Sequence, residues 1–403
     1  MIFFIILTTL LYVALSIKDH ARALSLLPAL TPLYLIRLQL GPIPSTLLEL
    51  LIGTAILFWL YTKPWKRITW NWHMVWLVLP LATIVIGILR APDTFSAIGI
   101  AKAYYLEPIL LFFAFRDRFK QEDWKYAVKY LGISATILAL YGVFQWLSGV
   151  GLPIPYDFTR RITSVFDYPN AYGLFVAPIA VLLCSFPHLT KRWRLLGMCL
   201  ATTLLLSQTE SGLVAVAVTL GFWYVTKVPA SHRTRILRAL GVCIVALAMF
   251  AIPTVRQKLF LLDPSGLVRR SQWQETIELL SHNPIWGVGF EAYPTSLIPY
   301  HIHMQYEIFQ YPHNLILNAW VEAGIANVLL ILFFMGVTGY MFLKTPCGSI
   351  RLAGQLAMCT MFIHGLVDVP FYKNDLAILA GFCIALALAL NATQNCLIPR
   401  QPQ

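Results

Sequence analysis

Long apolar runs separated by short polar links make up most of this chain. A run of about 17–20 residues is long enough to cross roughly 30 Å of hydrocarbon as a helix. The candidate runs fall at about 2–17, 23–38, 45–61, 74–89, 96–115, 127–147, 170–187, 195–208, 211–226, 237–253, 314–343, 350–367 and 374–392. Because only helices and closed barrels satisfy their backbone polar groups in lipid, the pattern predicts an all-α polytopic membrane protein with about 12–13 transmembrane helices.

Two polar stretches interrupt these runs, a long one at 254–312 and a shorter one at 148–169. Segments of this kind lie outside the hydrocarbon and are the usual location of functional residues. We therefore divide the chain into N-terminal transmembrane helices (1–147), a core that contains both polar loops (148–343) and C-terminal transmembrane helices (344–403).

The longer polar stretch is expected to contain an amphipathic helix of its own. Its predicted start is Arg269-Arg270-Ser271-Gln272-Trp273, and the spacing of Trp273, Ile277 and Leu280 gives it an apolar side. The helix is predicted to end near His282-Asn283-Pro284, because a proline disfavours helix at the residue before it.

Composition excludes a soluble domain, since 58% of the residues are hydrophobic and only 12% are charged, against about 25% in soluble chains. If the stretch 254–312 lies on the non-cytoplasmic face, most of the 30 lysines and arginines fall on the cytoplasmic side, as the positive-inside rule requires. Examples are Arg67, Arg116, Lys344 and Arg400. The formal charge of +12 then reflects topology and contact with the lipid bilayer, and no nucleic acid is expected as a partner.

Cysteine and histidine spacing does not indicate a metal site. The seven cysteines, from Cys184 to Cys396, show no Cys-x-x-Cys spacing, and none falls in 254–312, so we expect neither zinc nor a disulfide framework. His301, His303 and Glu307 have the residue types of metal ligands, but solvated loop histidines are the favoured interpretation.

The strongest candidate for chemistry is Tyr311-Pro312-His313-Asn314, which leads directly into an apolar run. Proline is suited to the first position of a helix, which would place His313 and Asn314 in the first turn. Free N–H groups there attract phosphate, and a neutral imidazole beside a bound anion is a competent general base. The alternative is a histidine that is simply hydrogen-bonded to loop carbonyls.

Basic residues in or near the two polar loops are candidate anion ligands. Arg160 and Arg161 fall in the shorter loop, and a guanidinium group can contact phosphate through two hydrogen bonds. Lys102 lies inside an apolar run, where it either pairs with Glu107 or another neighbour or binds phosphate. Asp368 is a candidate second base or a partner of an active-site arginine.

Several motifs now stand in a recognisable order. They are Arg161 with Phe166 and Pro169-Asn170, then Arg269 with Trp273 and Pro284-Ile285-Trp286-Gly287-Val288-Gly289, then Pro312-His313-Asn314-Leu315 with Trp320, Glu322, Gly324 and Ile325. With these motifs the sequence resembles the O-antigen ligase family, which is similar to O-antigen polymerases and other bactoprenol-dependent glycan transferases. One departure is that the family often has Ser-Arg-Gly where this chain has Glu210-Ser211-Gly212.

The resemblance implies a GT-C-like helical bundle in the bacterial inner membrane, with a capping segment on its periplasmic face and a cavity open to lipid. It implies a glycan donor on undecaprenyl diphosphate and a glycolipid or glycan as acceptor. No metal or other cofactor is expected, because the arginines can supply the positive charge. Arg161 and Arg269 would bind the diphosphate, with Arg160 or Arg270 in place of the missing arginine, and Lys102 is a further candidate. His313 would be the base or would orient the acceptor.

A direct mechanism is consistent with these assignments. Cations aimed at the leaving diphosphate lower the barrier, while His313 takes a proton from the attacking hydroxyl, which predicts inversion. Asn314 would orient the imidazole or bind the acceptor, and Tyr311 would pack against sugar. The same residues would suit a polymerase or a ligase that modifies protein, and a lipid-glycan transporter would use the arginines without a base.

Overall fold

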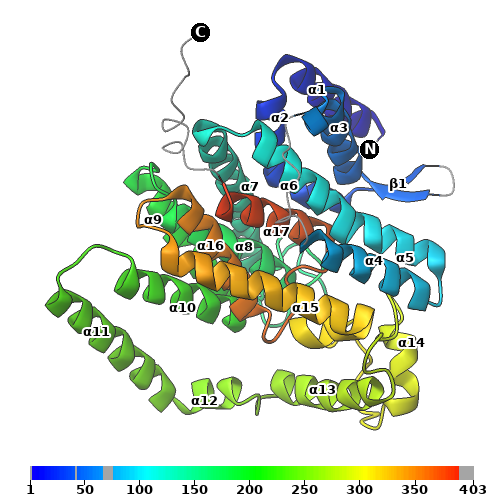
Figure 1. Ribbon diagram of the computed structural model, residues 1–403. Coiled ribbons are helices and arrows are strands. Elements are labelled where there is room, and N and C mark those ends of the chain that lie inside the picture. Colours follow the sequence, from blue (N-terminus) through cyan, green and yellow to red (C-terminus); the bar gives the residue numbers. More distant parts are fainter. Residues whose placement is uncertain (1, 41–42, 67–75, 390–403) are drawn as a thin grey trace.

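The computed structural model describes residues 2–40, 43–66 and 76–389 (Figure 1). The helices of the first half are α1 (Ile2–Lys18), α2 (His20–Leu26), η1 (Leu27–Leu35), α3 (Leu47–Tyr61), η2 (Pro64–Lys66), α4 (Val78–Arg90), α5 (Thr94–Ile100), η4 (Ala101–Leu106), α6 (Glu107–Arg118), α7 (Gln121–Ser148) and α8 (Pro169–Ser185). The second half contains α9 (Lys191–Leu206), α10 (Glu210–Thr226), α11 (His232–Ala251), α12 (Pro253–Leu259), α13 (Pro264–His282), α14 (Tyr293–Leu297), η5 (Ile298–Tyr300), α15 (Leu315–Lys344), α16 (Ile350–His364) and α17 (Asn374–Ala387).

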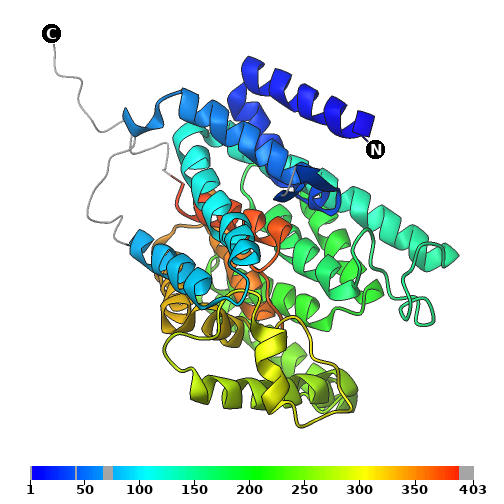
Figure 2. The ribbon, with the colours of Figure 1, turned by 90° about the vertical axis from the view of Figure 1, so that its right-hand side faces the viewer.

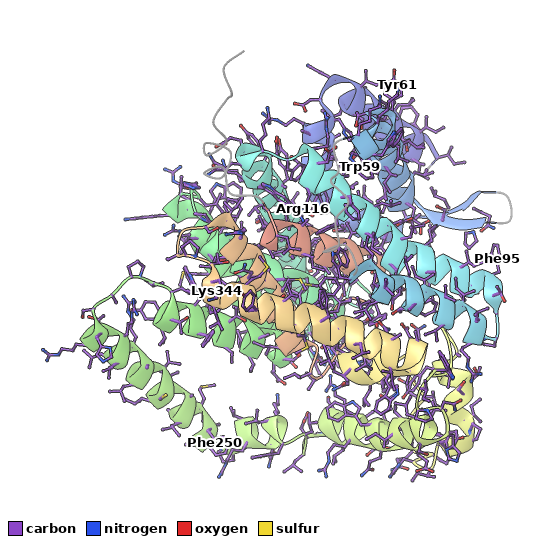
Figure 3. The ribbon with its side chains drawn as sticks, viewed as in Figure 1. Trp59, Tyr61, Phe95, Arg116, Phe250 and Lys344 are labelled. Carbon is purple, nitrogen blue, oxygen red and sulfur yellow. The ribbon has the colours of Figure 1, made fainter. Side chains whose placement is uncertain are left out.

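Within this described part of the chain, four helical stretches are long and apolar enough to cross a membrane: Thr94–Arg118, α7, α11 and α15. Six shorter apolar helices accompany them. The prediction of an all-α polytopic membrane protein is therefore confirmed. Figure 3 shows Phe95 at the right edge of the bundle, with Arg116 and Lys344 well to the left of it.

The predicted helix over 23–38 is wrong. α2 ends at Leu26 and continues as the 3-10 helix η1, which contains Pro28 and Pro32. Proline has no N–H to donate and its ring clashes with the preceding turn, so this segment cannot remain a regular α-helix. An antiparallel hairpin of β1 (Arg37–Leu40) and β2 (Ile43–Thr46), which the hydrophobic pattern did not predict, follows it.

The amphipathic helix of the polar stretch begins earlier than predicted. α13 starts at Pro264, which occupies the first turn after Asp263, and it ends at His282 as expected. Proline suits this position because the first helical N–H groups have no partner within the helix. The predictions that involve Arg67, Arg400 and Cys396 fall outside the described residues.

The centre of the bundle is α8, which is buried along almost its whole length. It packs against α9 on one side and α16 on another, while α17 packs against α6 and η1, so helices from both ends of the chain share one core. Figures 1 and 2 both show α13 along the lower edge of the molecule and α1 at the top. The polar stretch therefore lies at the periphery of the bundle.

A break in α15 fixes that stretch to the bundle. Ala323 and Gly324 have non-helical dihedral angles, and the segment 285–288 fills the gap with two backbone hydrogen bonds. Val288 N–H donates to Val321 O (2.7 Å), and Ile325 N–H donates to the Ile285 carbonyl (3.0 Å). The freed carbonyl and N–H groups of α15 are thus satisfied by another chain segment, as a buried helix break requires.

Neither glycine at this junction leaves room for a side chain. Gly287 has φ +65°, and a Cβ there would lie 2.4 Å from the Val321 oxygen. Gly324 has φ +63°, and its Cβ would lie 1.9 Å from the Ile285 oxygen. We call the segment 285–288 together with the break in α15 the backbone clip.

We predict that Gly324→Ala separates the backbone clip and destabilises the protein by more than about 2 kcal/mol, through both a steric clash and an unfavourable φ. Thermal unfolding in detergent, followed by tryptophan fluorescence, measures the effect. Gly336→Ala is the matched control, because it is in the same helix with nothing within 4 Å of its Cβ. Equal melting temperatures for the two variants would contradict this role of the clip.

Candidate active site

His313 lies two residues before the start of α15, with φ +47°. The predicted position in the first helical turn is wrong, because Asn314 is the N-cap and the helix starts at Leu315. The Asn314 side-chain oxygen accepts from the N–H groups of Ile316 and Leu317, both at 3.0 Å. An asparagine cap competes well for the free N–H groups of a first turn, and this moves the helix start past His313.

The other end of the Asn314 side chain holds a second segment. Its Nδ2 donates to Leu366 O (2.9 Å), and Leu315 N–H donates to Gly365 O (2.8 Å). The loop of residues 365–373, between α16 and α17, is thereby fixed against the start of α15. We call this segment the 365–373 loop. Asn314 positions the loop, and a direct contact with substrate stays a prediction.

Asp368 from this loop faces His313. The imidazole Nδ1 lies 3.3 Å from Asp368 Oδ1, and the Asp368 side chain is 0% exposed. Burial raises the pKa of Asp368, but the hydrogen bond and charge of His313 outweigh it, so the pKa lies well below the usual range of aspartate. An ionised carboxylate accepts hydrogen bonds and cannot donate them, so Nδ1 donates in this contact, and in the neutral imidazole Nε2 is then the nitrogen without a proton.

Two further residues orient this pair. Asn170 Nδ2 donates to Asp368 Oδ2 (3.2 Å), so the Pro-Asn motif at the start of α8 supports the carboxylate. Trp273 Nε1 donates to Pro312 O (2.8 Å), which ties α13 to the residue before His313. The sequence analysis noted the two motifs only for their order along the chain. Contacts between segments that are distant in sequence give the motifs their roles.

Arg269 and Arg161 converge on the same region. Arg269 Nε donates to Val367 O (3.1 Å), next to Asp368, and Arg161 Nε donates to Ser207 O (3.2 Å). Burial lowers the pKa of Arg161, and the charge of Arg269 is near enough to lower it further. Two cations held this close together favour binding of an anion between them, and a guanidinium group keeps its charge in such surroundings.

Of the remaining predicted residues, Tyr311 lies beside His313, and the basic residues have partners or exposure of their own. Tyr311 is beside His313, with ring centroids 4.9 Å apart, and its hydroxyl is 2.8 Å from that of Tyr168. Arg160 Nη1 donates to Trp146 O (3.3 Å), and Arg270 is exposed on α13. Lys102 pairs with Glu49 at 2.9 Å, so a neighbour other than Glu107 compensates its charge. Diphosphate binding by Arg160, Arg270 and Lys102 stays a prediction.

The sequence analysis gave no role to two titratable groups at the edge of the site. Glu210, one residue before the position where the family often has an arginine, forms an ion pair with Lys258 of α12. His364 is 1% exposed and packs against Gly212, where a Cβ would lie 3.2 Å from its Cε1 atom. His364 stands four residues before Asp368, and this spacing could have identified it as a neighbour of the site. No local pattern indicates that Lys258 is the partner of Glu210.

His301 and His303 have a structural partner. Both Nδ1 atoms lie 3.0 Å from the Glu275 carboxylate, which also accepts from the N–H groups of Ile302 and His303. Burial raises the pKa of Glu275, but the hydrogen bonds from the two histidines outweigh it and hold the pKa below the usual 4.5. The carboxylate thus ties the loop after η5 to α13.

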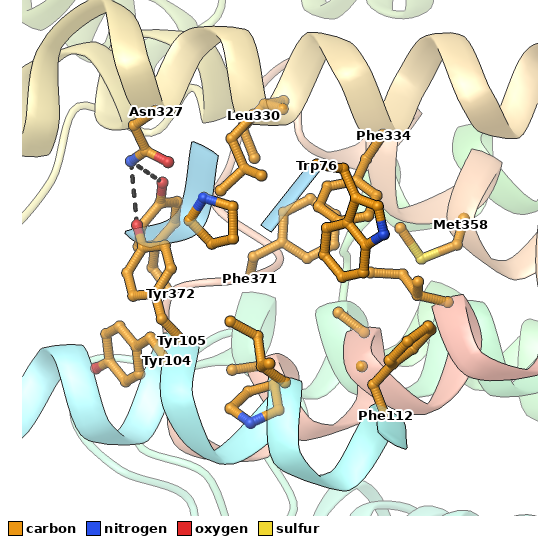
Figure 4. A pocket seen from close by; sticks show the side chains of 18 of the residues that line it. Trp76, Tyr104, Tyr105, Phe112, Asn327, Leu330, Phe334, Met358, Phe371 and Tyr372 are labelled. Carbon is orange, nitrogen blue, oxygen red and sulfur yellow. Dashed lines mark hydrogen bonds between the residues drawn. The ribbon is translucent and has the colours of Figure 1, made fainter. Parts of the chain in front are cut away.

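A separate cavity of about 110 Å³ lies between α4, the η4–α6 stretch, α15 and α17. Figure 4 shows Tyr104, Tyr105, Tyr372 and Asn327 at one end of it. Aromatic and aliphatic side chains, including Trp76 and Phe112, line the remainder.

Fold and site together define a helical membrane protein in which a His-Asp pair and two arginines meet beside a polar segment. The family model described as O-Antigen ligase matches residues 195–334. The resemblance to the O-antigen ligase family is therefore confirmed, and the match covers this segment of the chain. A comparison with curated proteins finds no match.

We predict that Glu275→Gln accelerates backbone hydrogen exchange in residues 298–308 about tenfold or more, because hydrogen bonds to a charged group are lost. A carboxyl group with a lowered pKa stabilises the fold above pH 4.5, and this contribution is lost as the pH falls further. Wild type should therefore show faster exchange in the same residues below that pH.

Glu278→Gln is the control for this experiment, since Glu278 is an exposed residue of the same helix. If the two variants exchanged alike, or if wild type showed no acid-induced change in 298–308, Glu275 would not hold the loop.

Proposed function

We propose that this protein is an integral membrane glycosyltransferase that moves a glycan from undecaprenyl diphosphate to an acceptor hydroxyl, as an O-antigen ligase does. The observation that carries the proposal is the His313–Asp368 pair next to Arg161 and Arg269. The O-antigen ligase domain at residues 195–334 supports the same class of reaction.

The proposed step begins with the diphosphate of the donor between Arg161 and Arg269. His313 Nε2 takes the proton of the acceptor hydroxyl while that oxygen attacks the anomeric carbon from the face opposite the diphosphate. The bond from the anomeric carbon to the diphosphate oxygen breaks, and its electron pair leaves with the diphosphate, whose charge the two arginines stabilise. The new glycosidic bond has inverted configuration.

Asp368 acts through His313 in this scheme. Its carboxylate fixes the tautomer in which Nδ1 is protonated and stabilises the imidazolium that forms, as the buried aspartate does in serine hydrolases. Arg269 binds the same loop through Val367, so the cation and the base keep a fixed relation. Such fixed positions are important because small displacements of reacting groups cost large factors in rate.

The active site is proposed to face the periplasm of a bacterial inner membrane. Support comes from the basic residues, which with this orientation gather on the cytoplasmic side, for example Arg116, Arg118 and Lys344. A donor carried on a membrane lipid and an acceptor glycan are the partners of this reaction.

We expect His313→Ala and Arg269→Ala each to lower transfer by about 10²–10³-fold without loss of membrane insertion, because each removes a group that acts in the transition state. The assay reconstitutes the protein with an undecaprenyl-diphosphate glycan and candidate acceptors and weighs the products by mass spectrometry. Arg256→Ala, which changes an exposed arginine of the same polar segment, is the matched control.

The products also distinguish the rival functions. Glycan on a new acceptor supports a ligase. Longer glycan that remains on the carrier would indicate a polymerase instead. Movement of intact donor across the bilayer that does not depend on His313 would indicate a transporter and would contradict the proposal.

Asp368→Asn separates orientation from charge. The amide can present a donor to Nδ1 and so favour the wrong tautomer, and we expect a loss of at least about 10²-fold in kcat with little change in KM for the donor. A wild-type rate for this variant would exclude Asp368 as the positioning residue for His313.

Because guanidinium groups supply the positive charge in this scheme, transfer is expected to continue in the presence of a chelator. The test adds excess chelator to the reconstituted enzyme and then restores divalent ions one at a time. Activity that disappears with chelation and returns with one ion would contradict the metal-free mechanism.

A further inference from the structure

A row of polar groups leads from Tyr311 to the polar end of the cavity. The Tyr311 hydroxyl is 2.8 Å from that of Tyr168, and Lys373 Nζ lies 4.1 Å from the centroid of the Tyr168 ring. The neighbouring Tyr372 meets Tyr104 edge to face, with ring centroids 6.4 Å apart. These groups are in a part of the bundle where most side chains are apolar, so their clustering needs a reason.

Asn327 anchors the far end of this row. Its Nδ2 donates to the hydroxyls of Tyr372 (2.7 Å) and Tyr105 (3.1 Å), and Figure 4 shows all three side chains at one end of the cavity. The asparagine is 0% exposed, yet its Oδ1 has no hydrogen-bond partner in the described structure. Nearly every buried polar atom of a folded protein has a partner, so this oxygen is available to a ligand.

Two carboxyl groups nearby have the same property. Asp375 is 1% exposed, and its Oδ1 has no hydrogen-bond partner among the described residues. Glu322 is half-buried, and its Oε2 also has no hydrogen-bond partner there. Tyr104 lies near both acidic side chains and near Glu291. The three unpartnered atoms on Asn327, Asp375 and Glu322 are oxygens that accept hydrogen bonds, whereas Asn318 Nδ2, close to Glu322 and Tyr372, is an unpartnered donor. Hydroxyl groups both donate and accept, so a molecule rich in O–H groups suits all four atoms.

The backbone around this cluster is irregular on two sides. Tyr104 and Tyr105 belong to η4, which is a π-helix, and Glu322 immediately precedes the break at Ala323 and Gly324 in α15. π-Helical turns occur often at functional sites, and irregular backbone at membrane depth is tolerated where it is buried in protein or lines a polar cavity.

We propose that Tyr104, Tyr372, Asn327, Glu322 and Asp375 form an acceptor subsite, which binds a neutral or amino sugar through its hydroxyl and amino groups and disfavours anionic sugars. We call these five residues the tyrosine–carboxylate cluster. The assignment rests on the proposed function and names the acceptor class for it. It places the donor diphosphate with the arginines and the acceptor with the acidic side chains, separated by His313 and Tyr311.

Hydrogen-bond chemistry explains the selectivity. The oxygens of Glu322 and Asp375 accept hydrogen bonds from sugar hydroxyl and amino groups, whereas a uronate or a sugar phosphate would place further acceptor oxygens and a charge beside them in a poorly solvated site. The aromatic faces of Tyr104 and Tyr372 add apolar contact for the sugar ring. The remainder of the cavity is lined by aromatic and aliphatic side chains, which suit a short alkyl chain on the probe described below.

The direct test is binding. Protein in lipid nanodiscs is titrated with hexyl glucoside and with hexyl glucuronide in a calorimeter, without donor. Wild type is expected to bind the glucoside saturably and the glucuronide at least about tenfold more weakly. Asp375→Asn and Glu322→Gln should each weaken glucoside binding about tenfold and bring the two affinities closer together.

Asp117→Asn is the matched control, because Asp117 is an acidic residue on α6 whose side chain bonds Trp59 away from the cluster. Melting curves identify any variant that fails to fold, and the two cluster variants are independent of each other. Absence of saturable glucoside binding, or equal affinity of wild type for the two sugars, would overturn the proposal and leave water as the partner of the free oxygens.

Transfer kinetics separate this inference from the function on which it rests. With hexyl glucoside as acceptor, Asp375→Asn should raise the acceptor KM about tenfold and leave the donor KM unchanged. If wild type binds the glucoside with the expected selectivity but no acceptor receives glycan, the proposed function fails and the sugar site remains. If transfer proceeds and the variants leave acceptor KM unchanged, the acceptor subsite lies elsewhere.

Discussion

The fixed position of the 365–373 loop against the start of α15 is the constraint on which the candidate site depends. Two hydrogen bonds hold it, from Asn314 Nδ2 to Leu366 O and from Leu315 N–H to Gly365 O. With the loop in this position, Asp368 meets His313 and Val367 O meets Arg269. The same asparagine caps α15, so one side chain sets both where the helix begins and where the carboxylate lies.

The polar segment is held to the bundle by contacts of a different kind. The backbone clip uses main-chain hydrogen bonds and two glycines, and Trp273 links α13 to the carbonyl before His313. Main-chain contacts of this kind depend on close approach of two backbones, and for this reason they need glycine. The base and the arginine of α13 therefore belong to one rigid arrangement, although the residues that build it are far apart in sequence.

Electrostatics gives the proposed site two unlike sides. Arg161 and Arg269 lie near each other, and the pair of Glu210 with Lys258 adds one charge of each sign at their edge. The tyrosine–carboxylate cluster carries acidic groups and unpartnered oxygens. An enzyme that joins an anionic donor to a hydroxyl-bearing acceptor needs such a division, because the same surface cannot favour both.

The sequence by itself determined the class of protein, since runs of apolar residues and a low charged fraction require membrane helices. It also identified His313, Arg161 and Arg269 as candidates, because they stand in polar loops beside helix starts. It failed over 23–38, where Pro28 and Pro32 interrupt the helix, and at the start of α15, where the cap at Asn314 won over Pro312. Only the tertiary structure decided that Asp368 faces His313, that Glu275 binds His301 and His303, and that α15 is broken around residue 324. These features are contacts between segments distant in sequence, and local periodicity contains no information about which distant segment completes a hydrogen bond.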